Sequence, residues 1–284
     1  MTEIAVGRSE TRPLSTMSLL QARVVITTVA VLVGLAGVGW FWTVHAAGDM
    51  SSMAMGLGQV GVLMPADLSA PVFLFMWLAM MVAMMFPTIA PMVLAHRMVT
   101  RHRGEGFAAT ISFVLGYLVV WTAIGLVPLA AILTLDAVAM HGAAPAWAAG
   151  ASGGILIVAG LYQFTPAKNV CLRHCRTPLD FILTHDFGRG SRSAFRAGLS
   201  HGAFCLGCCW ALMAVLVVVG LMNLVWMAVL AVVFLAEKNL RWGIVVNRVA
   251  GTAVAALGVA VLLAPRLLVN LSGAQNAMGM NPHM

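Results

Sequence analysis

The chain has 284 residues, of which 61% are hydrophobic and only 9% are charged, and its net charge is +7 at neutral pH. Because a soluble domain carries about 25% charged residues, this composition excludes an ordinary soluble domain and indicates an integral membrane protein. The basic residues stand in short segments between apolar runs, which is typical of membrane topology and not of a nucleic-acid-binding surface. We therefore expect a lipid bilayer, and no nucleic acid, as a partner.

The apolar runs predict an all-α fold, a polytopic transmembrane helical bundle of about seven spans within residues 24–268. The continuous apolar stretch 198–237 is too long for one helix, so we divide it near Gly220. The sixth segment is short enough to be tilted or re-entrant, and a six-span bundle is the main alternative. In chain order, the spans are placed at about 24–46, 71–95, 107–134, 145–165, 198–219, 221–237 and 243–265.

The charge of the connecting segments predicts the orientation. Fifteen of the sixteen Lys and Arg residues fall on one side of this topology, and only Arg266 falls on the other. By the positive-inside rule the N-terminal segment, residues 1–23, is cytoplasmic and the tail, residues 269–284, is outside and mobile. The first apolar run is long enough to span, so we expect a retained helix in a bacterial inner membrane.

Methionines gather on one half of the second span. Two interpretations remain open, because Met is a flexible packing residue in helical bundles and its thioether also binds soft cations such as Cu(I). Pro87 removes a backbone donor inside this span and predicts a kink beside the methionines. The candidate ligands here are Met80, Met84 and Met85.

The fifth span carries the strongest candidate metal site. At about 100° per residue, one imidazole and three thiols share an arc of roughly 100° on this helix. One helix fills at most two or three coordination positions, so a second element must contribute ligands. Gly198 and Gly202 lie near the same face and would let that element approach closely. The four side chains are His201, Cys205, Cys208 and Cys209.

The long connection 166–197 is the candidate second element. If it is helical, Cys171 and Cys175 lie one turn apart on one face. Both are placed on the cytoplasmic side, where a reducing environment disfavours disulfides. Glu237 ends the sixth span and either completes the metal site, carries protons, or forms an interface charge pair with Lys238.

Four motifs occur together between about residues 70 and 240. They are Trp77…Met80-Met81…Met84-Met85…Pro87, Lys168…Cys171…Cys175-Arg176…Pro178, Gly198…Gly202…Cys205-x-Gly207-Cys208-Cys209-Trp210…Met213, and Glu237-Lys238. In this combination the chain resembles a bacterial family of unknown function whose members are described as predicted metal-binding integral membrane proteins. The resemblance implies a polytopic helical protein with a metal site, and it implies no particular reaction.

The sequence thus predicts a membrane protein that handles a soft transition metal, with copper(I) expected and zinc as the alternative. Its partners would include other membrane proteins or metallochaperones. Two other functions stay open: a membrane thiol-disulfide oxidoreductase, in which the two cysteine clusters exchange electrons, and a structural subunit of a larger membrane complex.

Overall fold

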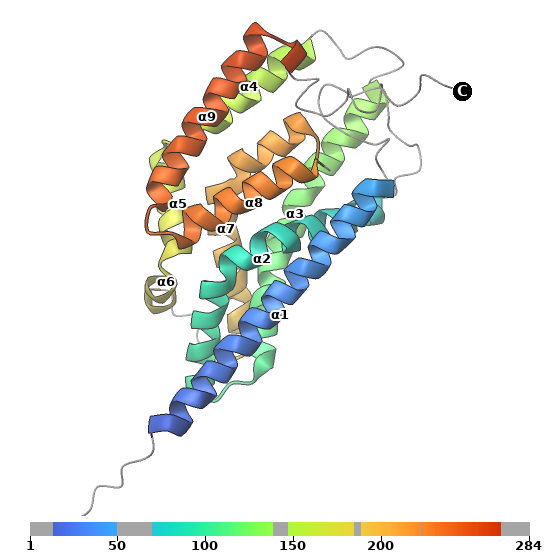
Figure 1. Cartoon of the computed structure of the whole chain (residues 1–284). Coiled ribbons are helices and arrows are strands. Elements are labelled where there is room, and N and C mark those ends of the chain that lie inside the picture. The colour runs from blue at the N-terminus through green and yellow to red at the C-terminus, as the bar shows by residue number, and fades with distance from the viewer. Residues whose placement is uncertain (1–13, 50–69, 139–146, 185–188, 222, 268–284) are drawn as a thin grey trace, which may run out of the picture.

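The computed structural model describes residues 14–49, 70–138, 147–184, 189–221 and 223–267. This part of the chain forms nine α-helices and no β-strand, which confirms the all-α prediction (Figure 1). In chain order the helices are α1 (Leu14–Asp49), α2 (Ala70–His102), α3 (Phe107–Val138), α4 (Trp147–Tyr162), α5 (Pro166–Arg176), α6 (Pro178–Thr184), α7 (Ser191–Val219), α8 (Leu224–Asn239) and α9 (Gly243–Leu263).

Five of these helices, α1, α2, α3, α7 and α9, are long and apolar enough to cross a membrane. The pair α4 and α5 passes the same test together but is bent by 62° at the break between them, which gives up to six candidate spans among the described residues. The count of about seven is not confirmed, because α8 has only 16 residues. At 1.5 Å per residue it is about 24 Å long, less than the roughly 30 Å of a hydrocarbon core.

Two segments that we placed outside the expected spans contain helix. The connection 166–197 holds α5, α6 and the first turns of α7, so it is largely helical. Helix α1 begins at Leu14, inside the segment 1–23 that we expected to precede the bundle. The tail at 269–284 lies outside the described residues.

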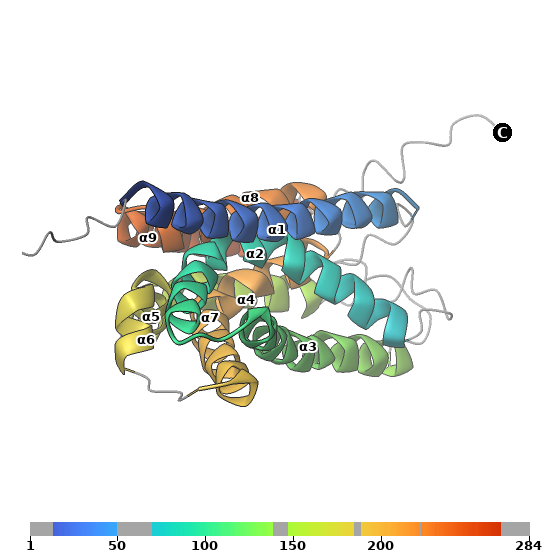
Figure 2. The same cartoon turned by 90° about the horizontal axis from the view of Figure 1, so that it is seen from below.

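Helices α2 and α7 form the centre of the bundle and carry most of its fully buried side chains. Figure 2 shows α5 and α6 together on one side of the bundle, next to α7. The ribbon of α2 bends along its length (Figure 1), and two prolines, Pro87 and Pro91, lie inside it. Each proline removes one backbone hydrogen bond of the helix, which accounts for the bend.

The glycines of α7 serve a different neighbour from the one we expected. A Cβ atom on Gly198 would lie 2.0 Å from the carbonyl oxygen of Phe113, and one on Gly202 would lie 3.0 Å from the side chain of Val120. Both contacts belong to α3, so these glycines seat α3 against α7 and not the cysteine-bearing α5. Small residues at helix crossings allow such close backbone approach.

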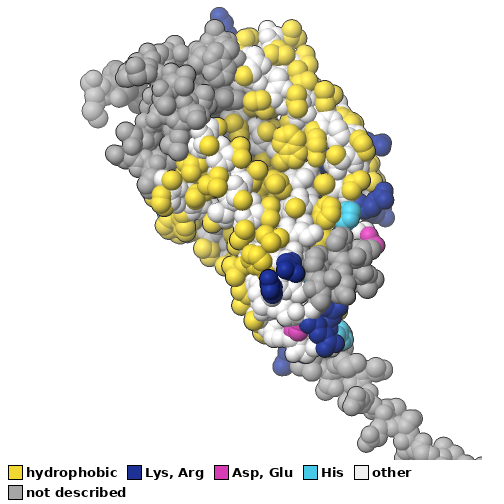
Figure 3. Space-filling view, turned by 180° about the vertical axis from the view of Figure 1, so that it is seen from behind, with side chains coloured by type: hydrophobic (Ala, Val, Ile, Leu, Met, Phe, Trp, Pro, Cys, Tyr) yellow, Lys and Arg dark blue, Asp and Glu magenta, His cyan; other side chains and the backbone are white. Residues whose placement is uncertain are grey.

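The surface of the bundle is strongly apolar. Side chains such as Ile26, Val38 and Phe41 of α1 are more than half exposed. Figure 3 shows hydrophobic side chains over most of the visible face, with Lys and Arg gathered mainly toward one end. An exposed apolar surface of this extent marks a binding or membrane-contacting face in a protein.

Candidate metal site

Three thiols of α7 lie together in the centre of the bundle. Cys205, Cys208 and Cys209 are each at most 2% exposed. The Cys209 sulfur is 3.9 Å from the Cys205 sulfur and 3.6 Å from the Cys208 sulfur. The spacing i, i+3, i+4 places them on one helix face, and the thiols of Cys208 and Cys209 donate to the Cys205 carbonyl oxygen at 3.1 and 2.7 Å.

A fourth thiol comes from α5. Thr165 caps this short helix by accepting from the Lys168 backbone N–H, and Pro166 occupies its first turn, where the missing donor costs nothing. Lys168, Leu172 and Cys175 follow at i, i+4 and i+7, so they share the face that packs against the bundle. The Cys175 sulfur lies 3.8 Å from that of Cys208.

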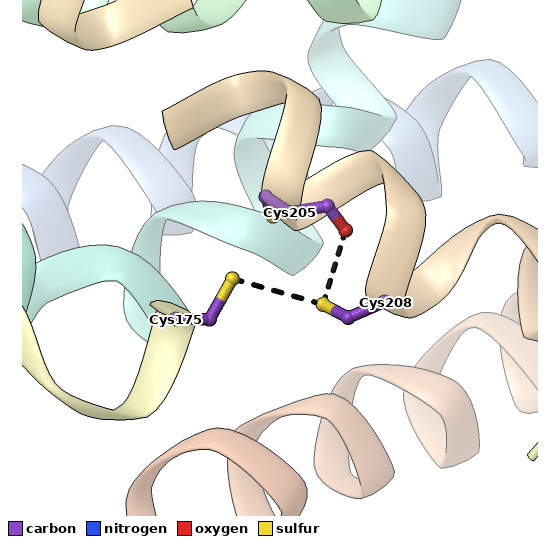
Figure 4. Close-up of side chains that lie close together, drawn as sticks. All are labelled: Cys175, Cys205 and Cys208. Carbon is purple, nitrogen blue, oxygen red and sulfur yellow. Dashed lines mark hydrogen bonds between the residues drawn. The ribbon is translucent and has the colours of Figure 1, made fainter. Parts of the chain in front are cut away.

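The sulfurs of Cys175, Cys205 and Cys208 all lie within 4.8 Å of one another. Figure 4 shows the Cys208 sulfur between the Cys175 sulfur and the Cys205 carbonyl oxygen. A metal–sulfur bond is about 2.3 Å long, so three sulfurs around one trigonal ion would be about 4.0 Å apart. All five cysteines are described by the structure and are free. The three sulfurs are therefore spaced for a shared soft ion. We call these three residues, together with Cys209, the thiol cluster.

The Cys205 sulfur has two further polar neighbours. The Tyr117 hydroxyl lies 3.2 Å from it, and the Lys238 ammonium donates to it at 3.1 Å. The same ammonium donates to Thr88 Oγ1 at 3.3 Å and lies 3.7 Å from the Met85 sulfur. Lys238 is only 5% exposed, so the fold holds a fixed positive charge against the sulfur that would carry negative charge in a metal complex.

A buried ion pair fixes α5 beside α8. The Lys168 ammonium donates to both carboxylate oxygens of Glu237, at 3.0 and 3.2 Å, and both side chains are fully buried. Gln163 accepts a further hydrogen bond from Lys168. Arg176, at the end of α5, donates to the Glu237 carbonyl oxygen at 2.7 Å and to the Leu240 carbonyl oxygen at 2.8 Å. These contacts hold Cys175 at its position against α7.

The other sequence-predicted residues lie near the cluster in different ways. His201 is 1% exposed and lies one turn before Cys205 on α7. Cys171 lies against Gly207, where an added Cβ would be 2.6 Å from its sulfur. Met80 and Met84 are each 1% exposed in the hydrophobic core. Of the three candidate methionines, Met85 has its sulfur near the Lys238 ammonium. The Glu237 carboxylate pairs with Lys168 and not with the thiols.

Sequence reasoning missed Tyr117 and Thr88, and it treated Lys238 only as an interface charge. One signal was present: the whole chain has two tyrosines. Tyr117 contacts the Cys205 sulfur, and the Tyr162 hydroxyl donates to the Gly207 carbonyl oxygen at 2.7 Å. Both tyrosines thus contact the cysteine segment of α7. A hydroxyl in an apolar span requires a buried partner, which points to the polar part of the bundle.

Comparison with known proteins identifies the family. No curated protein and no solved structure matches the chain. A family model described as PpoB2, copper chaperone, matches residues 74–261, which is about two thirds of the chain. The match begins in α2 and ends in α9, so it includes the whole thiol cluster, Lys238 and the Lys168–Glu237 pair. The chain belongs to the PpoB2 copper chaperone family.

Proposed function

We propose that the protein is a membrane-embedded copper chaperone that holds Cu(I) at the thiol cluster. The observation that carries this proposal is the convergence of buried sulfurs from two helices, Cys175 of α5 with Cys205 and Cys208 of α7. Soft thiolates favour Cu(I), and zinc is the alternative that thiolates also bind. Cys209 is a fourth sulfur, 3.6 Å from that of Cys208, and the Met85 thioether lies 3.7 Å from the Lys238 ammonium that contacts Cys205.

The surroundings of the cluster suit a chaperone. A chaperone must hold its ion away from water and competing ligands and then release it to another protein. The cysteines of α7 are buried, whereas α5 is a short helix at the side of the bundle whose Cys175 is partly accessible. We propose that Cys175 is the ligand that leaves first when copper passes to a membrane or soluble partner, with Cys171, one turn away, available to follow the ion.

We propose that the bundle is inserted in a bacterial inner membrane with its N-terminus in the cytoplasm. The five or six apolar helices and the exposed apolar surface support insertion. The position of most basic residues in connections on one side supports the orientation.

The direct test is the copper content of the purified protein. The full chain is purified in detergent under reducing conditions, loaded with Cu(I), freed of excess metal and measured by elemental analysis. We expect near-stoichiometric copper in the wild type and strong loss in Cys175→Ser, Cys205→Ser and Cys208→Ser. The matched control is Cys171→Ser, because Cys171 lies outside the three-sulfur group. Absence of copper from the wild type would refute the proposal.

A second candidate function is thiol-disulfide exchange. The 3.8 Å between the Cys175 and Cys208 sulfurs favours it, since a small movement of α5 would bring them to the roughly 2.05 Å of a disulfide bond. Two-electron oxidation would join the two sulfurs and release two protons, with a membrane quinone as the acceptor class. Formation of a reversible Cys175–Cys208 bond, together with no retained copper, would favour this function. If serine at the cluster changes neither copper content nor redox behaviour and the protein co-purifies with partners, the role is structural.

A further inference from the structure

A small cavity of about 40 Å³ lies where α2 ends and α7 begins. His96 of α2, Glu105 of the connection to α3 and Ser193 of α7 are among the residues that line it. His96 Nδ1, Glu105 Oε1 and Ser193 Oγ are buried without a hydrogen-bond partner among the residues that the structure describes. Buried polar atoms normally have partners. A water needs about 10–15 Å³ of such volume, so this cavity has room for a small hydrated ligand.

The inner wall of this cavity is in contact with His201. Phe113 and Phe181 line the cavity, and both rings also pack against the His201 imidazole. Their ring centroids lie 6.0 Å and 5.5 Å from that of the imidazole, the first stacked and the second edge-on. His201 is 1% exposed, and neither ring nitrogen has a hydrogen-bond partner in the described part of the chain. An imidazole without a hydrogen-bond partner among the described residues therefore lies behind the two rings that line the cavity.

From His201 the thiol cluster is one helical turn away. His201 and Cys205 are i and i+4 on α7, so they share a face. The Tyr117 ring is stacked on the imidazole at 6.0 Å, and its hydroxyl lies 3.2 Å from the Cys205 sulfur. At the outer end, His96 stacks on Phe113 at 4.6 Å. The side chains thus form a continuous series from the cavity to the cluster.

We propose that this series is the route by which copper is loaded: His96 and Glu105 receive the ion in the cavity, and His201 transfers it to Cys205. The inference rests on the proposed function of the thiol cluster. Imidazole nitrogen binds copper, and thiolate is the softer ligand that Cu(I) prefers, so transfer toward the cluster is favourable. Two arginines, Arg97 and Arg103, and one carboxylate, Glu105, act on His96, so the donor atoms, and not net charge, attract the ion. Rotation of the Phe181 ring would open the passage.

The test measures the rate of loading separately from the final copper content. The detergent-solubilised full chain is mixed with the Cu(I)–bicinchoninate complex, and the loss of the complex's absorbance is followed in time. We expect His201→Phe and His96→Phe to load at least about tenfold more slowly than the wild type, and to reach the same copper content. Phe replaces a ring by a ring, which conserves packing. The control is His174→Phe. His174 lies on α5, its imidazole stacks on the Phe204 ring at 4.1 Å, and it does not line the cavity.

Wild-type loading rates in His201→Phe and His96→Phe would overturn the route while leaving the thiol site intact. If His201→Phe instead loses its final copper content as Cys208→Ser does, with an unchanged melting temperature, then His201 is a ligand of the resident site, which also overturns the route. A wild type that retains no copper refutes the proposed function itself, so the two failures are distinguishable.

Discussion

The ion pair between Lys168 and Glu237 gives the sharpest stability prediction. Glu237→Gln removes the negative charge and leaves the fully buried Lys168 ammonium with only neutral amide oxygens, that of Gln163 and that of the new side chain, as partners. Breaking a buried pair by removing one partner typically costs about 3–5 kcal/mol, because the remaining charge has lost its compensation. We expect a loss near the lower end, about 3 kcal/mol, since the Gln163 oxygen still accepts from the ammonium. The free energy of unfolding is measured by SDS titration in mixed micelles, with tryptophan fluorescence as the signal.

The double variant Lys168→Met, Glu237→Met separates the charge from the packing. Replacing both charges by apolar side chains is often neutral or stabilising, so we expect the double variant to be more stable than Glu237→Gln. The exposed Asp180 gives the control, and Asp180→Asn should change stability by less than about 1 kcal/mol. If the single variant costs as little as this control, or if the double variant costs more than the single, the reasoning from the buried pair is wrong.

Three further predictions concern the cluster and its support. Lys238→Met should weaken Cu(I) retention by about 10- to 100-fold in chelator competition, because the complex loses the positive charge 3.1 Å from the Cys205 sulfur. Unchanged retention would show that Lys238 does not support copper binding. Gly198→Ala should destabilise the protein by about 1–3 kcal/mol, because its Cβ would meet the Phe113 carbonyl oxygen, whereas Gly154→Ala has open space and should not. Copper at about 100 times its dissociation constant should stabilise the folded state by about 2.7 kcal/mol and so raise the melting temperature. A chelator should reverse this rise. A melting temperature that does not depend on copper would contradict binding to the folded protein.

The end of α8 shows how three consecutive residues organise the site. Glu237 pairs with Lys168 of α5, Lys238 contacts Cys205 of α7, and Asn239 donates to the Thr88 carbonyl oxygen of α2 at 3.4 Å. Helix α8 is too short to span by itself, and Glu237 and Lys238 near its end are buried, whereas Asn239 is exposed. The buried pair Glu237 and Lys238 thus connects the helix that carries Cys175 to the helix that carries the other thiols.

The sequence by itself determined the features that depend on local periodicity. Apolar runs predicted helices at α1, α2, α3, α4, α7, α8 and α9. The helical repeat placed Cys205, Cys208 and Cys209 on one face. Both properties follow from residues within a few turns of one another.

Only the tertiary structure decided which groups from distant segments meet. It brought Cys175 of α5 to the thiols, Lys238 and Tyr117 to the Cys205 sulfur, and α3, in place of α5, to the glycines of α7. Such contacts depend on how helices cross and how their side chains interlock, and periodicity within one helix carries no information about its neighbour. The site therefore consists of one helix face that is readable from sequence and a surrounding set of residues that packing alone supplies.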